Sequence, residues 1–207
     1  MNIIILKTKE EIGKELAKSF IELIKIKPNA CLALATGSSP IELYENLVES
    51  YEKNEIDFSQ IKTVNLDEYC DTKPTDEWSY ATFMNDILFS KINIKEENTF
   101  VPNGIIDPKD ACDKYNMVLD DNIRDIQILG IGTNGHIAFN EPGTSFKTRT
   151  HQVDLTESTI NANKRFFDND ISKVPKKAIT MGLEDIMKSK KILLVAKGIE
   201  KQDAIYN

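Results

Sequence analysis

Cysteine is scarce in this sequence. The 207 residues include three cysteines, Cys31, Cys70 and Cys112, and no two of them form a C-x-x-C pair. Their odd number and their spacing argue against a disulfide framework and against a zinc cluster. Cys31 stands inside the apolar run CLALAT, where a small core hydrophobe is expected.

A basic excess and long apolar runs are missing as well. The 26 Lys and Arg residues against 33 Asp and Glu residues give a net charge of −7 and a pI near 5.0. Partners that need a basic face, nucleic acid and anionic membranes, are therefore not expected, whereas a phosphorylated small substrate needs only a few local cations and amides. The sequence shows no signal peptide and no membrane span, so we expect a cytoplasmic protein.

What remains is an ordinary globular composition, 41% hydrophobic and 29% charged, in which predicted strands alternate with predicted helices. Apolar runs of strand length occupy 3–6, 31–36, 61–66, 125–132 and 191–198, and helical patterns occupy 10–26, 39–53, 78–88 and 111–123. This order predicts an α/β fold, doubly wound, with a mainly parallel sheet and helices on both faces. Nothing marks a boundary, so a single domain over 1–207 is expected.

Three of the predicted strands end in turns rich in polar side chains. The turns read ATGSSP at 35–40, NLDEY at 65–69 and GIGTNGH at 130–136. Ligands of open α/β sheets sit beyond the carboxyl ends of the strands. We therefore expect the three turns to converge on one crevice.

The first turn contains Thr36, Gly37, Ser38 and Ser39, before a helix expected to begin near Pro40 with Ser39 as its N-cap. Free amides and the positive helix end would bind an anion. A plain strand-to-helix turn with a capping serine explains the same residues. It is not a P-loop, because the Gly-Lys-Ser/Thr ending is missing.

The second turn carries two adjacent acids, Asp67 and Glu68. A solvated turn, a metal site, or a catalytic base beside a structural acid are all compatible with the pair. Neighbours on an extended chain point to opposite sides, so only one of them faces a given ligand. A carboxylate held on a rigid strand can remove a proton next to a carbonyl or an imine.

The third turn spells G-x-G-x-x-G, the fingerprint of a dinucleotide site. That site needs a helix directly after the last glycine, and Pro142 and Gly143 would stop one almost at once. What remains is His136 with Glu141, a pair that can move protons near neutral pH, although a single histidine is often structural. Asn134 can hydrogen-bond but is neither acid nor base.

Two cations, Arg165 and Lys201, complete the set of candidates. Arginine binds phosphate through a planar fork and lysine through a point charge, although either residue could equally lie on the surface. The motifs together, in order, resemble the glucosamine-6-phosphate deaminase family. The matching segments run from residue 33 to 201: ALATGSSP, NLDEY, SYATFM, GIGTNGHIAFNEPGTSF, NANKRFF and GIEK.

The resemblance implies a Rossmann-like fold of the NagB type and an enzyme of amino-sugar catabolism without metal or organic cofactor. Such an enzyme converts glucosamine 6-phosphate and water to fructose 6-phosphate and ammonia, by aldose–ketose isomerisation with deamination. By motif match, Asp67 would be the enolisation base, and His136 would open the sugar ring with support from Glu141 and Asn134. The first turn, Thr36 to Ser39, would hold the 6-phosphate of the substrate together with Arg165 and Lys201. Residues 155–170 resemble the family's mobile lid over the site.

This sequence departs from the family at three places. Asn134 stands where some members have aspartate, so activity with a modified pH profile is expected. His151 and Val153 occupy positions where allosteric hexamers carry basic residues, so we expect a monomer or homo-oligomer without activation by N-acetylglucosamine 6-phosphate. The family usually continues for a further strand and helix beyond the closing AIYN, which are expected to be absent here.

Two other functions are compatible with parts of this pattern. A 6-phosphogluconolactonase shares the fold and the glycine-rich histidine loop, but Glu141 and the acid in NLDEY are what an isomerase needs. A sugar-phosphate sensor would carry an N-terminal helix-turn-helix, whereas here the first predicted strand begins at residue 3.

Overall fold

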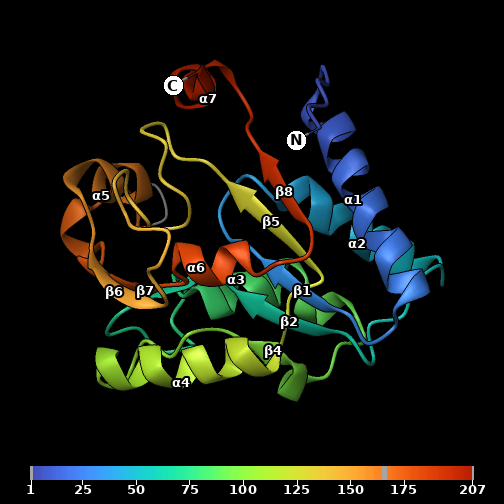
Figure 1. Cartoon of the computed structure of the whole chain (residues 1–207), viewed down its shortest axis with the longest axis horizontal. Helices are drawn as coiled ribbons and strands as arrows, with labels where there is room; N and C mark the ends of the chain where they lie inside the picture. The colour runs from blue at the N-terminus through green and yellow to red at the C-terminus, as the bar shows by residue number, and fades with distance from the viewer. Residues whose placement is uncertain (1, 165–166, 207) are drawn as a thin grey trace.

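The central element of the computed structural model, which describes residues 2–164 and 167–206, is a five-stranded parallel sheet (Figure 1). Its strand order is β4-β2-β1-β5-β8. The strands are β1 Cys31–Leu34, β2 Lys62–Asn65, β4 Thr99–Phe100, β5 Ile126–Gly130 and β8 Ile192–Val195. The predicted α/β fold with a parallel sheet is confirmed.

A second sheet of three antiparallel strands was not predicted. It has the order β3-β7-β6, with β3 Asp67–Tyr69, β7 Lys177–Thr180 and β6 His151–Asp154. Strand β3 follows β2 almost directly, and Leu66 between them joins the two sheets. Its amide donates to Leu34 O at 3.2 Å, and its carbonyl accepts from Met181 N at 2.7 Å. The chain therefore changes sheets directly before Asp67.

Helices cover both faces of the parallel sheet, as predicted. Helices α1 and α2 pack together on one side, and α4 and α6 lie on the other (Figure 1). The helices are α1 Lys9–Ile26, α2 Ile41–Glu52, α3 Tyr80–Ile87, α4 Pro108–Asp121, α5 Glu157–Asn163, α6 Leu183–Met187 and α7 Gln202–Tyr206. Short 3-10 turns are η1 Phe89–Lys91, η2 Glu96–Asn98, η4 Ile171–Lys173 and η5 Ile199–Lys201.

Helix α1 illustrates how the sequence forms these elements. Thr8 and Glu11 form a capping box, which satisfies amides of the first turn. Ala17, Phe20 and Ile24 are buried at helical spacing. A Cβ on Gly13 would lie 2.4 Å from Glu42 Cβ, so glycine is required where α1 crosses α2.

Two local predictions were wrong. Residues 3–6 form no strand, and Ile3 to Ile5 are exposed, because no described strand lies beside them to complete their backbone hydrogen bonds. Helix α2 begins at Ile41 with Pro40 as its N-cap, and no side chain caps it. Ser39 is therefore not the N-cap, and its hydroxyl is left for another partner.

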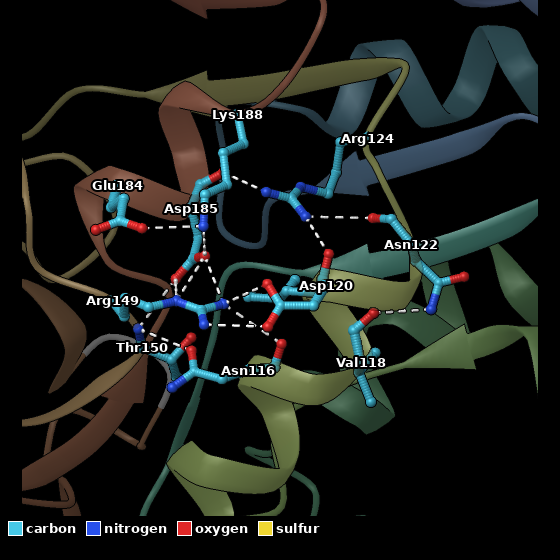
Figure 2. Close-up of polar contacts among 11 residues, drawn as sticks. Asn116, Val118, Asp120, Asn122, Arg124, Arg149, Thr150, Glu184, Asp185 and Lys188 are labelled. Atoms are coloured by element: carbon cyan, nitrogen blue, oxygen red, sulfur yellow. Dashed lines mark hydrogen bonds and ion pairs between the residues drawn. The ribbon is translucent and has the colours of Figure 1, made fainter.

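A partly buried polar cluster joins α4, α6 and the segment that enters β6 (Figure 2). Arg149 Nη2 donates to Asp185 Oδ1 at 2.9 Å and to Asp120 Oδ1 at 2.8 Å. The fully buried Arg124 donates to Leu119 O at 2.6 Å and to the backbone carbonyl of Asp185. The cluster fixes the end of the long loop after β5, and that loop carries His136.

Among the described residues, no helix is both long and apolar enough to cross a membrane.

We predict that Arg149→Met lowers the free energy of unfolding by about 3 kcal/mol, because it leaves the carboxylate of Asp185 buried with a weaker set of partners. The Asp185 side chain is 1% exposed, and Lys188 Nζ is 3.4 Å away. Denaturant unfolding measures the loss. Lys173→Met is the control, because Lys173 pairs with the exposed Asp168 and should cost less than about 1 kcal/mol. Equal losses in the two variants would contradict the prediction.

Candidate functional site

The three polar turns meet at one cavity of about 600 Å³. They contribute Thr36 to Ser39 after β1, Asp67 at the start of β3, and, from the end of β5 onward, Gly130, Ile131, Gly132, Thr133 and His136. The predicted convergence at the carboxyl ends of parallel strands is confirmed. Helix α5, the start of α3 and the turn after β8 form the other walls.

Asp67 and Glu68 point to different cavities, as strand geometry requires. Asp67 lines the cavity that also contains His136, whereas Glu68 lines a second one of about 590 Å³. Glu68 Oε1 and Oε2 accept from Tyr80 N at 3.0 Å and Ala81 N at 3.1 Å, at the start of α3. We take the first cavity as the candidate site because acid, histidine and free amides gather there.

The carboxyl group of Asp67 is buried, and this decides its proton affinity. Burial, together with the negative charge of Glu68, raises the pKa of Asp67 to about 8. Burial also raises the pKa of Glu68 to about 7, although three backbone amides that donate to its carboxylate oppose that rise. Asp67 can therefore exchange a proton near neutral pH, which an ordinary surface aspartate does not do.

His136, Glu141 and Asn134 form a connected group on the loop after β5. Asn134 Nδ2 donates to Glu141 Oε2 at 2.6 Å, and His136 N donates to Asn134 Oδ1 at 3.2 Å. His136 Nδ1 lies 3.9 Å from Glu141 Oε1 and is buried without a hydrogen-bond partner among the described residues. Burial lowers the pKa of His136. The negative charge of Glu141 opposes this lowering, and the positive charge of Lys201 adds to it. A neutral imidazole is the form that accepts a proton.

The glycines of the fingerprint make room for His136 and allow the tight turn that precedes it. A Cβ on Gly132 would lie 2.5 Å from the imidazole of His136, so only glycine leaves room for the ring. Gly135 has a φ of +90°, a conformation that favours glycine. No helix begins in the described residues 136–150. The structure thus agrees with the argument against a dinucleotide loop.

The turn after β1 offers unpaired donors to the cavity. The amides of Gly37, Ser38 and Ser39 have no hydrogen-bond acceptor among the described residues. They lie at the N-terminal end of α2, where the helix dipole favours an anion. Lys201, in η5, lines the same cavity, whereas Arg165 lies outside the described residues.

Two features of the site were missed by sequence reasoning. Lys197 lines the cavity beside the serine turn, and Tyr69 and Tyr80 form part of its wall. Tyr80 OH donates to Tyr69 OH at 3.2 Å, and Asn163 Nδ2 of α5 donates to Tyr69 OH at 2.8 Å. The segment predicted as a lid thus contacts the site through α5. Among the described residues, no group of three or more histidines, cysteines or acids is placed to hold a metal ion.

The fold and the site define a doubly wound α/β protein with acid–base groups at the carboxyl edge of a parallel sheet. Residues 7–207 match the model of the family described as glucosamine-6-phosphate isomerases/6-phosphogluconolactonase, and the chain belongs to that family.

Curated relatives of similar sequence are named glucosamine-6-phosphate deaminase. The protein from Thermoanaerobacter sp. (strain X514) is 52% identical over 207 residues, which cover 99% of this chain and 81% of that protein. The protein from Clostridioides difficile (strain 630) is 48% identical over 209 residues, which cover 100% of this chain and 84% of that protein.

Solved structures give the same fold, and one of them is also similar in sequence. A monomeric glucosamine-6-phosphate deaminase of the NagB superfamily superposes with a TM-score of 0.96 at 44% identity, covering 100% of this chain and 86% of that one. A 6-phosphogluconolactonase from Thermotoga maritima superposes with a TM-score of 0.76 at 20% identity, covering 97% of this chain and 86% of that one. At this identity the superposition shows a shared fold and nothing more.

We predict that Glu68→Gln lowers the pKa of Asp67, because the variant removes the neighbouring negative charge while it keeps an oxygen acceptor for the amides of α3. NMR titration of the side-chain carboxyl carbons measures the shift directly. Burial still holds the pKa above that of a free aspartate. A pKa of Asp67 that stays at about 8 or rises would contradict the Coulombic contribution of Glu68.

Proposed function

We propose that this protein is a glucosamine-6-phosphate deaminase, which converts glucosamine 6-phosphate and water to fructose 6-phosphate and ammonia. The observation that carries the proposal is that one cavity holds a buried carboxyl, a histidine that lies beside Glu141, and a turn of free amides. The relatives that share about half of its residues support the same activity.

Ring opening is the task proposed for His136. The reaction needs a proton removed from O1 and a proton delivered to the ring oxygen O5. The lowered pKa of His136 keeps the imidazole neutral at neutral pH and ready to accept the first proton. Glu141 Oε1, at 3.9 Å from Nδ1, favours the imidazolium that forms, and Asn134 holds Glu141 in place.

Isomerisation and deamination follow at Asp67. Its carboxylate would take the proton from C2 of the open chain and return it to C1, which converts the 2-amino aldehyde into a 2-imine. Water adds to C2 of that imine, and ammonia leaves. The raised pKa makes Asp67 a stronger base than a surface carboxylate, so the proton transfer from carbon is less unfavourable.

The phosphate is proposed to bind at the opposite end of the cavity. Thr36, Gly37, Ser38 and Ser39 would supply amides and hydroxyls, with Lys201 as the described cation and Arg165 as a further one. Because the phosphate is remote from the reacting carbons, its binding energy serves to position C1 and C2. The segment 155–170 would close over the bound sugar.

The quaternary and regulatory proposals rest on β6. His151 and Val153, in β6, stand where the resemblance places the basic residues of allosteric members. We therefore propose a single catalytic domain that acts without an anionic activator, as a monomer or homo-oligomer.

Lactone hydrolysis is the second candidate, because 6-phosphogluconolactonases share the fold. That reaction removes no proton from carbon, and one general base, such as His136, is enough to activate the attacking water, so a second base at Asp67 has no assigned task in it. Measuring lactone hydrolysis beside ammonia release separates the two activities.

We predict that the purified protein releases ammonia from glucosamine 6-phosphate and that Asp67→Asn reduces kcat by about 10²–10⁴-fold while substrate binding remains. A coupled ammonia assay gives kcat, and calorimetry gives binding. A near-normal rate in the variant would remove Asp67 from the mechanism.

The same variant has a built-in folding control. The folded state binds the Asp67 proton more tightly than the unfolded chain, so this residue lowers stability as the pH rises from 3.8 to about 8. Asparagine does not titrate, so Asp67→Asn lacks this pH-dependent loss of stability. The unfolding midpoint of the variant at pH 9 should therefore exceed that of the wild type. A lower midpoint would contradict the raised pKa assigned to Asp67.

We predict that Asn134→Asp stays active and moves the acidic limb of its pH–rate profile to higher pH. The new carboxylate would lie next to Glu141, where Asn134 now donates at 2.6 Å, and would place a second negative charge beside His136. The added negative charge also favours protonated His136. The measurement is kcat against pH for both proteins, and superimposable profiles would contradict the role given to Asn134.

A further inference from the structure

Lys197 connects two segments that lie far apart in the sequence. It stands between β8 and η5, and its Nζ donates to Ser38 O at 2.8 Å, in the turn after β1. The same Nζ donates to Glu42 Oε2, in the first turn of α2, at 2.5 Å. Lys197 and Ser38 both line the candidate cavity. One side chain therefore ties the turn after β8 to the proposed phosphate turn.

The surroundings of this pair differ from those of an ordinary surface ion pair. The side chains of Lys197 and Glu42 are 19% and 13% exposed, whereas those of Lys53 and Glu49, at the C-terminal end of α2, are 57% and 58% exposed. Exposed pairs are weakened by solvent and by side-chain entropy, and a half-buried pair is weakened less. Glu42 itself is confined by α1, because its Cβ fills the space left by Gly13. Lys197 is thus held in one place.

The hydrogen bond to Ser38 O also sets the direction of a donor. The carbonyl of Ser38 and the amide of Ser39 belong to one planar peptide and point to opposite sides. Fixing the carbonyl therefore fixes the Ser39 amide, which has no acceptor among the described residues. Tyr44 OH holds the turn at Ala35, but among the described residues no other hydrogen bond holds the backbone of 37–39, and α2 has no side-chain cap.

We propose that Lys197 is a positioning residue for phosphate recognition: it orients the Ser38–Ser39 peptide so that the turn presents its free amides to the phosphate group. This inference rests on the proposed function, because it assigns the turn to the 6-phosphate. Glu42 neutralises Lys197 and holds it against Ser38, so Lys197 acts through the turn. Lys201 remains the cation that faces the cavity from η5.

The first test is Lys197→Met, with Lys197→Arg as the conservative variant. We expect the KM for glucosamine 6-phosphate to rise about tenfold in Lys197→Met, as for the loss of one hydrogen bond to a charged group, while kcat changes less than twofold. The Kd for inorganic phosphate, measured by calorimetry, should rise in parallel. Lys197→Arg keeps charge and donors and should restore most of the affinity.

The second test, Glu42→Gln, separates positioning from direct contact. If Lys197 acts through Ser38, loss of the partner that holds it raises the KM and the Kd for phosphate. If Lys197 were a phosphate ligand restrained by Glu42, the same variant would free it and lower both constants. A fall in either constant would overturn the proposal, and this variant decides the question even if Lys197→Met does not fold.

Matched controls complete the experiment. Lys53→Met removes the exposed pair on the same helix, away from the cavity, and should leave the KM, kcat and phosphate Kd unchanged. An unchanged KM and phosphate Kd in a folded Lys197→Met would refute the inference. A wild-type protein that releases no ammonia would instead refute the proposed function, and the phosphate measurements would still report on Lys197.

Discussion

The hydrogen bonding of Leu66 is the constraint on which the site depends. Its amide continues the pairing of β2 with β1 by donating to Leu34 O, and its carbonyl accepts from Met181 N beside β7. One residue therefore belongs to both sheets, and Asp67 follows it at the corner between them. A carboxylate on a free loop would point toward the solvent, whereas here the two sheets hold Asp67 in the wall of the cavity. Its raised pKa is a consequence of this corner, because the strands that meet there exclude solvent.

The site combines groups whose burial works against their charged forms. Burial raises the pKa of Asp67 to about 8 and lowers that of His136 below its usual value, so Asp67 binds its proton more tightly than the histidine does, the reverse of the usual order. Both shifts carry a cost in stability, which the rest of the fold must offset. The cluster around Arg149 and Asp185 is one such contribution, because it anchors the segment that follows the histidine loop to α4 and α6.

Much of this arrangement could be predicted from the sequence, for local reasons. The turns after β1, β2 and β5 carry their own signals, because glycine, serine and paired acids at strand ends follow rules of short range. The antiparallel sheet escaped prediction because β3 pairs with β7 over more than a hundred residues, as in Asp67 with Thr180. Residues 3–6 were mistaken for a strand for the converse reason: apolar residues give strand character, but pairing needs a neighbour. Lys197 was missed because its partners, Ser38 and Glu42, stand 159 and 155 residues away.

The glycine fingerprint shows why a pattern needs its physical reason. The same spacing serves a dinucleotide when a helix N-terminus follows, since the glycines then let the backbone approach a pyrophosphate. Here the chain turns back instead, and the bridge between Ile137 and Asn140 closes a tight loop. Gly132 is needed because the imidazole of His136 occupies the position of its missing side chain. Free amides and a helix end coincide in another turn, at the start of α2, and that turn is where we propose that the phosphate binds. The letters alone would place a phosphate at Gly130–Gly135, but in the structure the imidazole of His136 fills the space beside Gly132.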